Sequence, residues 1–119
     1  MTCEIEFTDE FGAWWDHLSL SEQDSVDRYV GLLEAYGVAL KYPHSSDIAS
    51  SRHTQMRELR IQHEGRPYRV LYAFDPRRMA VLLIGGDKTG NNRWYDEYVP
   101  RADKLYDRYL EEIRKEGLI

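Results

Sequence analysis

The sequence has little of what marks secreted, membrane-spanning or metal-binding proteins. It contains one cysteine, Cys3, so no internal disulfide can form. No apolar run approaches the roughly 18 residues that a membrane span needs. The acidic N-terminus lacks the basic-then-apolar layout of a signal peptide. No CxxC or paired-histidine spacing indicates a metal site, and we expect neither a metal nor a cofactor. These absences predict a cytoplasmic protein with no membrane partner.

What is present is typical of a single globular domain. The 119 residues are 42% hydrophobic and 31% charged, and we expect one domain over residues 1–119. The net charge of −5 is unevenly distributed, since residues 52–101 carry +4 and the rest of the chain carries −9. A basic segment between acidic flanks permits a local site for phosphate groups on an otherwise acidic protein.

Hydrophobic periodicity predicts the element order β-α-α-β-β-β-α. We expect a strand over 3–7, helices capped by Thr8 and Ser21, a loop over 41–55, and a last helix opening at Val99 and Pro100. Between them lie strands over 56–63, 68–75 and 79–86, the first two joined by the four-residue turn EGRP. This order predicts an α+β fold, with a small antiparallel sheet packed by an N-terminal helical hairpin and a C-terminal helix.

Two arginines stand in the middle of the predicted strands. Alternation places Met56, Glu58, Arg60 and Gln62 on one face of their strand, and it could bring Arg60 and Arg69 onto the same open face of the sheet. Neighbouring arginines repel unless an anion offsets them. Glu58 could be that anion, or a phosphate could serve instead, because the guanidinium fork suits phosphate.

A basic and aromatic segment follows the third strand of the meander. Lys88 and Arg93 could neutralise phosphates while Trp94, Tyr95 and Tyr98 stack on bases. The simpler interpretation is that Trp94 and Tyr98 attach the last helix to the sheet.

Other polar residues have a structural alternative beside a functional one. Arg57 and Arg66 are candidate RNA contacts, although a solvated outer face is the better interpretation of both. His53 could be a general base, but a loop position without a role is the simpler interpretation. The remaining histidines, His17, His44 and His63, are expected at the surface.

The run ELRI, G-RPYRVLYAFD and VLLIGGDKTG, preceded by a helical hairpin, resembles the RelE/HigB-type toxins of bacterial toxin–antitoxin modules. The similarity is closest to the phage-derived, HigB-like branch. It implies a ribosome-dependent endonuclease that cleaves messenger RNA at the ribosomal A site, and a small antitoxin partner, expected to be a helix-turn-helix protein. Oligomers could form through that antitoxin.

The resemblance also implies roles for single residues. It matches Arg69 to a strand arginine implicated in catalysis, Arg60 to the ELR arginine and Lys88 to the lysine after the last strand. Tyr95 or Tyr98 corresponds more loosely to a late aromatic residue, and we expect Arg60, Arg69, Lys88 and Tyr95 to be the catalytic residues. The chain departs from the family in its acidic net charge and its lysine-poor segment over 87–98. These departures keep an alternative open, namely a ParE-like gyrase inhibitor or an inactive, partner-binding protein on the same scaffold.

Overall fold

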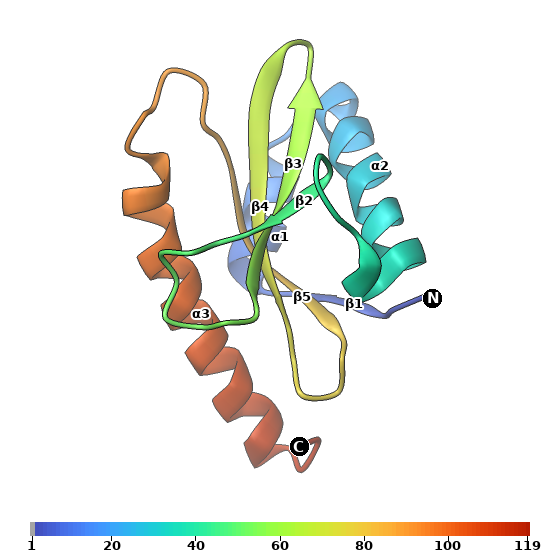
Figure 1. The fold of residues 1–119 in the computed structure, drawn as a ribbon, viewed down its shortest axis with the longest axis vertical. Coiled ribbons are helices and arrows are strands. Elements are labelled where there is room, and N and C mark those ends of the chain that lie inside the picture. Colours follow the sequence, from blue (N-terminus) through green and yellow to red (C-terminus); the bar gives the residue numbers. More distant parts are fainter. Residues whose placement is uncertain (1) are drawn as a thin grey trace.

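A computed structural model of the protein describes residues 2–119 as three α-helices and five strands (Figure 1). The elements are β1 (Ile5–Phe7), α1 (Asp9–Asp16), α2 (Leu20–Tyr36), a short 3₁₀ turn (Gly37–Ala39), β2 (Ser45–Asp47), β3 (Met56–His63), β4 (Arg66–Phe74), β5 (Ala80–Asp87) and α3 (Trp94–Lys115). No helix of the described residues is both long enough and apolar enough to cross a membrane.

The sheet has the strand order β1-β5-β4-β3-β2. Strands β3, β4 and β5 form the predicted antiparallel meander. The sheet differs from the expected antiparallel one at one edge, where β1 pairs in parallel with β5 and makes the sheet mixed. The predicted loop over 41–55 also contains β2, which pairs antiparallel with β3. The short strand β1 lies within the predicted strand over 3–7, whereas β2 is a three-residue polar strand, SSD, which leaves no alternating apolar signal in the sequence.

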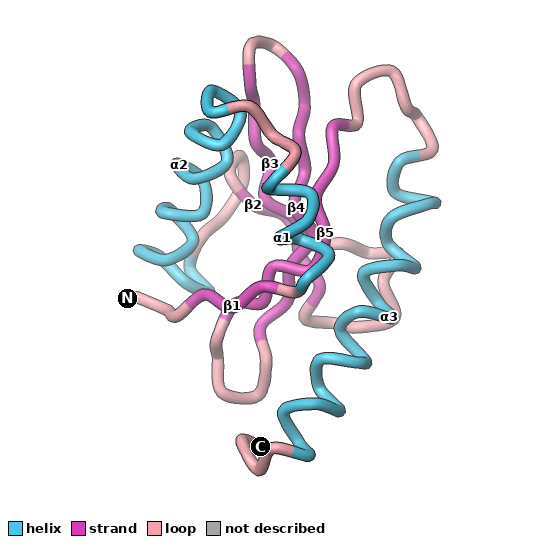
Figure 2. Tube along the Cα trace, turned by 180° about the vertical axis from the view of Figure 1, so that it is seen from behind, coloured by secondary structure: helices cyan, strands magenta, loops and turns pink. Residues whose placement is uncertain are grey.

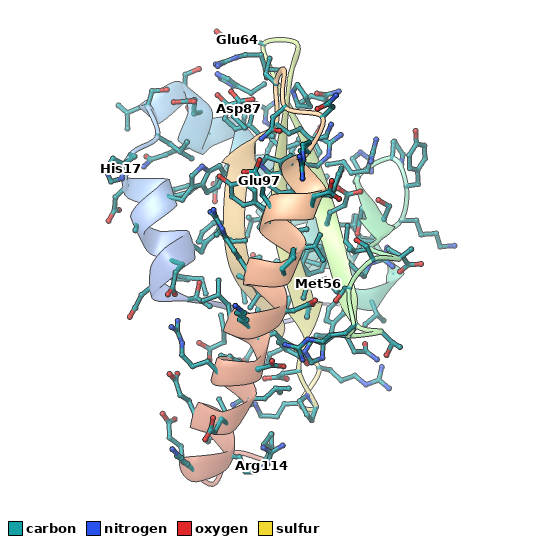
Figure 3. The ribbon with its side chains drawn as sticks, turned by 90° about the vertical axis from the view of Figure 1, so that its left-hand side faces the viewer. His17, Met56, Glu64, Asp87, Glu97 and Arg114 are labelled. Atoms are coloured by element: carbon teal, nitrogen blue, oxygen red, sulfur yellow. The ribbon has the colours of Figure 1, made fainter. Side chains whose placement is uncertain are left out.

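Helices cover both faces of the sheet, so the domain has two apolar layers. On one face, α1 and α2 pack against Leu59, Ile61, Val70 and Tyr72 (Figure 2). On the other face, α3 packs against Met56, Leu71, Val81 and Leu83 (Figure 3). The alternation expected from the sequence is therefore confirmed in β3 and β4, and it places Glu58, Arg60 and Arg69 on the α3 side.

The first helix of the hairpin begins at the predicted cap residue, and the second begins two residues earlier than predicted. The Thr8 hydroxyl accepts a hydrogen bond from the Phe11 amide and caps α1 as predicted. The cap of α2 is Ser19 rather than Ser21. Ser19 forms a reciprocal capping box with Glu22, and these two bonds satisfy two amides at once, which explains why this start is preferred.

Helix α3 starts at Trp94, five residues before the predicted start at Val99. Pro100 consequently lies inside the helix, where it cannot donate a backbone hydrogen bond. Pro100 is exposed, so water can solvate the carbonyl left without a partner. Trp94 is buried at 1% exposure, and the burial of this large side chain explains why the helix extends over the segment predicted as a loop.

The turn between β3 and β4 sets the register of the two arginines. It is a two-residue turn, Glu64 and Gly65, rather than the predicted four-residue EGRP. Both residues have positive φ, 49° and 78°, as in the type I′ turns that suit the twist of a hairpin. In this register the Cα partner of Arg60 is Arg69.

Candidate functional site

The carboxylate of Glu58 lies between the two strand arginines. Its Oε2 is 3.2 Å from Arg60 Nη1, and its Oε1 is 3.3 Å from Arg69 Nε. Ser46, on the edge strand β2, donates a 2.6 Å hydrogen bond to Oε2. The side chains of Glu58 and Arg69 are each 6% exposed, and that of Arg60 is 28% exposed. Glu58 is therefore the counter-ion that allows two arginines to be cross-strand neighbours.

Tyr95, in the first turn of α3, contacts both Glu58 and Arg69 and covers this cluster. Its hydroxyl donates a 2.6 Å hydrogen bond to Glu58 Oε1 and accepts a 3.3 Å bond from Arg69 Nε. Burial raises the pKa of Tyr95, the bond to Glu58 raises it further, and Arg69 opposes both effects. The phenol therefore keeps its proton at neutral pH and acts as a donor. The face predicted to be open is covered here, since Arg69 is only 5% exposed.

Lys88 adds a third cation beside the cluster. It follows β5, and its amide donates a 3.0 Å hydrogen bond to the carbonyl of Pro67. Its ammonium lies 5.6 Å from the centroid of the Tyr95 ring. Arg60, Arg69 and Lys88 against one Glu58 leave the cluster with a net charge of +2. Glu58 and Arg60 lie on β3 and Arg69 lies on β4, so the pairing of these two strands positions three of the four charged side chains.

Several donors of this cluster point to no protein acceptor within residues 2–119. Arg60 uses only Nη1, for Glu58. Arg69 uses Nε for Tyr95 and Glu58, and Nη1 for the carbonyl of Tyr68. Nε and Nη2 of Arg60 and Nη2 of Arg69 are thus the donors that an anion could bind without displacing Glu58.

Trp94 and Tyr98 have the structural role that was the simpler interpretation. Their rings stack with centroids 4.4 Å apart and planes 8° from parallel, and Trp94 lies in the core. Gly86, the Cα partner of Arg69 on β5, makes room for the indole. A Cβ at Gly86 would stand 2.6 Å from Trp94 Nε1. The indole is therefore buried and does not lie at the surface of the arginine cluster.

The other candidate RNA contacts lie apart from the cluster. Arg57 points to the opposite face, where its guanidinium pairs with Asp47. Arg66 stands near the hairpin tip, 3.2 Å from Asp87. Arg93 precedes α3 with its side chain 76% exposed. The structure therefore brings together Arg60, Arg69, Lys88 and Tyr95, and it leaves these three arginines outside the group.

A pocket of about 250 Å³ adjoins the two arginines, and no sequence pattern predicts its other walls. It is lined by Tyr29, Tyr42, Pro43, His44, Arg60, Gln62 and Arg69. Tyr42 and His44 come from the segment before β2, which reads as an ordinary polar loop. Only the pairing of β2 with β3 brings them beside Arg60, whose amide donates a 2.9 Å hydrogen bond to the His44 carbonyl.

Two histidines differ from their predicted surroundings. His63 is 5% exposed, so the prediction of a surface position is wrong; its Nδ1 lies 2.7 Å from the Ser25 hydroxyl. His53 is half-buried, with Nε2 2.7 Å from Asp107 and its ring edge-on to Tyr106. Both side chains join parts of the fold, and neither reaches the arginine cluster.

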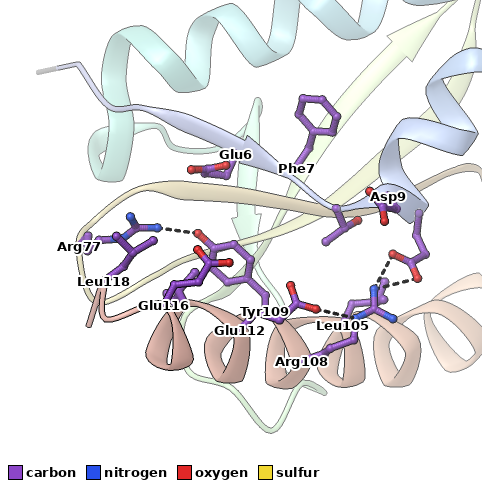
Figure 4. A pocket seen from close by; sticks show the side chains of 13 residues that line it. Glu6, Phe7, Asp9, Arg77, Leu105, Arg108, Tyr109, Glu112, Glu116 and Leu118 are labelled. Carbon is purple, nitrogen blue, oxygen red and sulfur yellow. Dashed lines mark hydrogen bonds and ion pairs between the residues drawn. The ribbon is translucent and has the colours of Figure 1, made fainter.

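A second groove of about 490 Å³ lies between β1 and the C-terminal half of α3 (Figure 4). Its carboxylates are Glu6, Asp9, Glu10, Glu112 and Glu116. Its two arginines are engaged, Arg77 with Asp75 and Arg108 with Glu10. This groove would repel phosphate, whereas the arginine cluster would attract it.

Comparisons with known proteins identify a family and two similar relatives. Residues 13–107 match the family described as phage derived protein Gp49-like. "Putative toxin HigB3" of Mycobacterium tuberculosis (strain ATCC 25618 / H37Rv) is 41% identical over 98 residues, 82% of this chain and 84% of that protein. "Putative toxin HigB2" of the same organism is 36% identical over 111 residues, 92% of this chain. The chain spans about half, 54%, of the length of HigB2.

A solved structure supports the same fold. A mutant of the E. coli toxin RelE in its free state superposes with a TM-score of 0.62 at 12% identity, covering 85% of this chain and 98% of that one. Sequence and fold thus agree, and the chain belongs to the Gp49-like family of phage-derived proteins, in the RelE/HigB group that its sequence resembles.

Proposed function

We propose that this chain is the toxin of a type II toxin–antitoxin module and cleaves messenger RNA on the ribosome, at the A site. The observation that supports the proposal is the cross-strand pair of Arg60 and Arg69, with Lys88 and Tyr95 beside it. The HigB-type relatives named as toxins favour the same function.

The cleavage needs no nucleophile from the protein. The 2′-hydroxyl of RNA attacks the adjacent phosphorus and loses its proton, while the bond from phosphorus to the 5′ oxygen breaks and that oxygen gains a proton. Negative charge builds up on the non-bridging oxygens in between. Fixed donors aimed at these oxygens lower the barrier, by about 3 kcal/mol for one well-placed donor.

The geometry suggests a role for each member of the cluster. The free donors of Arg60 and Arg69 bind the phosphate, and Lys88 stabilises the charge that develops on it. Tyr95 keeps its proton, which it donates to Glu58 in the free protein, and it can redirect that proton to the leaving oxygen once RNA is bound. Glu58 is a positioning residue, because its two oxygens hold both arginines and Tyr95 in one arrangement.

The partners follow from this function. A cognate antitoxin, expected to be a helix-turn-helix protein, would neutralise the toxin, and a larger assembly could form through it. The ribosome and its messenger RNA would be the targets, which places the activity in the cytoplasm. Ribosome-held RNA would compensate for a cluster without a paired histidine, because positioning alone can lower the barrier strongly.

Induced expression in bacteria, combined with mapping of RNA 5′ ends, tests the proposal. The wild type should arrest growth and produce in-frame cuts, and Arg69→Ala should abolish both. Arg60→Ala is a second variant, because Arg60 is more exposed and its loss is less disruptive to folding. Arg114→Ala, at the distant end of α3, is the matched control (Figure 3). A harmless wild type, or an Arg69→Ala protein of equal toxicity and abundance, would reject the proposal.

The alternative is a non-nuclease protein on the same scaffold, such as a ParE-like gyrase inhibitor or an inactive partner-binding protein. The net charge of −5 and the presence of only one lysine in residues 87–98 favour it. Intact messenger RNA together with a DNA-damage response after induction would support the gyrase inhibitor. Intact messenger RNA with normal growth would support the inactive protein.

A further inference from the structure

We propose that Tyr42 is the stacking platform of a nucleobase subsite beside Arg60 and Arg69. This inference rests on the proposed RNA cleavage and adds to it the place where one base of the substrate binds. The site is the pocket of about 250 Å³ that reaches from the arginine pair to the segment before β2. Tyr42 is remote from Tyr95 in sequence, and the two tyrosines approach the arginines from different elements.

The Tyr42 ring contacts Arg60 and is otherwise largely exposed. The guanidinium carbon of Arg60 lies 5.2 Å from the ring centroid, within the range of a cation–π contact. Tyr42 nevertheless remains 71% exposed, so most of its ring surface is available to a ligand. A base that stacks on the exposed ring surface would complete a three-layer arrangement of arginine, tyrosine and base.

The segment that carries Tyr42 is fixed by backbone hydrogen bonds. The amides of His44 and Ser45 both donate to the carbonyl of Lys41, at 3.0 and 3.1 Å. The carbonyl of His44 accepts from the amide of Arg60 at 2.9 Å. Tyr42 is thus tied to the strand that carries Arg60, so the platform and the phosphate donors keep a constant spacing.

The remaining walls suit the edge of a base. His44 and Gln62 line the pocket, and among residues 2–119 neither side chain has a hydrogen-bond partner in the protein. Both can donate and accept hydrogen bonds, as recognition of a base edge requires. The ring of Tyr29 also lines the pocket, with its centroid 6.0 Å from that of the His44 ring.

The other aromatic residues near the arginines are less suited to stacking. Trp94 is buried, and the Tyr98 ring is already stacked on Trp94 and has the guanidinium carbon of Arg101 5.0 Å from its centroid. Tyr95 directs its hydroxyl into the cluster. The exposed Tyr42 is therefore the aromatic surface that a splayed, single-stranded base can reach next to the bound phosphate.

Binding of a short single-stranded 2′-fluoro RNA, which lacks the attacking hydroxyl, tests the subsite by fluorescence anisotropy at low salt. Tyr42→Ala should weaken binding roughly 10- to 100-fold, as expected for the loss of one stacked base. Tyr42→Phe should bind like the wild type, because it keeps the ring. Tyr36→Ala, which removes another exposed tyrosine outside the pocket, is the matched control.

An RNA with one abasic nucleotide, moved through each position in turn, adds a second readout. One position should weaken wild-type binding and have no further effect on Tyr42→Ala. Equal binding by Tyr42→Ala and wild type, or no measurable wild-type binding, would overturn the subsite. Growth arrest by wild type and its loss in Arg69→Ala would still support the proposed function in that case, so the two failures can be told apart.

Discussion

Arg60 of β3 and Arg69 of β4 are direct cross-strand partners, and the carboxylate that separates their charges, Glu58, comes from the same strand as Arg60. Two cations in this position are costly unless an anion offsets them. The arrangement therefore uses a buried charge to hold two arginines in place while part of each guanidinium remains free for a ligand.

Replacing Glu58 by glutamine should destabilise the protein by about 3 kcal/mol. The substitution keeps the shape but removes the negative charge, and breaking a buried pair leaves uncompensated charges in the interior. Urea unfolding at neutral pH measures the change. Inorganic phosphate should restore part of the lost stability, because an added anion can replace the carboxylate. An unfolding free energy equal to that of the wild type would contradict the role of Glu58 as counter-ion.

Tyr95→Phe should lower toxicity while the fold is retained. The change removes the hydroxyl that donates to Glu58 at 2.6 Å and accepts from Arg69, and it should cost about 1–3 kcal/mol of stability. Thermal unfolding and growth after induction measure the two effects separately. Tyr36→Phe, which removes an exposed hydroxyl elsewhere, is the control. Full toxicity of Tyr95→Phe would show that this hydroxyl contributes nothing to cleavage.

Gly86→Ala should displace Trp94 and lower stability by about 1–3 kcal/mol, because an added Cβ would stand 2.6 Å from the indole nitrogen. Since Tyr95 follows Trp94 on the same turn of α3, toxicity should fall as well. Gly31→Ala is the matched control: apart from its own helix backbone, nothing lies within 4 Å of the added Cβ, and alanine favours the interior of α2 by up to about 1 kcal/mol. Tryptophan fluorescence and urea unfolding report the result. Equal stability of Gly86→Ala and wild type would refute this packing argument.

Stability should fall as the pH rises above about 10. Burial is the largest cause that raises the pKa of Tyr68 and of Tyr106, each to about 12, and it also raises that of Tyr72. These phenols keep their protons in the folded state while the unfolded chain loses them near pH 10. The unfolded state then binds fewer protons, so the free energy of unfolding decreases from about pH 10 towards 12. Urea unfolding between pH 8 and 11 measures this, and a flat profile would contradict the shifts.

Local patterns predicted much of this structure from the sequence. The alternation of Leu59 and Ile61 with Glu58 and Arg60 correctly predicts the two faces of β3, because successive side chains of a strand point to opposite faces of the sheet. The Thr8 cap and the apolar faces of the helical hairpin were recognised for the same reason. Glu58 was foreseen as a possible partner of the arginines, since it stands two residues from Arg60.

The sequence-based predictions are wrong where the local structure depends on contacts with a distant part of the chain. The sequence predicts the start of α3 five residues too late, because helix α3 begins where Trp94 packs against Gly86, and Gly86 lies on another element. Tyr42 and His44 carried no signal at all, since their place beside Arg60 depends on the pairing of a three-residue strand.

The sequence by itself determined the residue types, their alternation and the family to which the chain belongs, because these depend on short-range periodicity and on motifs along the chain. Only the tertiary structure decided that β1 joins the sheet in parallel, that Tyr95 closes over Arg69, and that Tyr42 lies next to Arg60. These relations depend on which strand edges pair and on which side chains fill the space between elements. That choice is made by the packing of the whole domain and by no single segment of it.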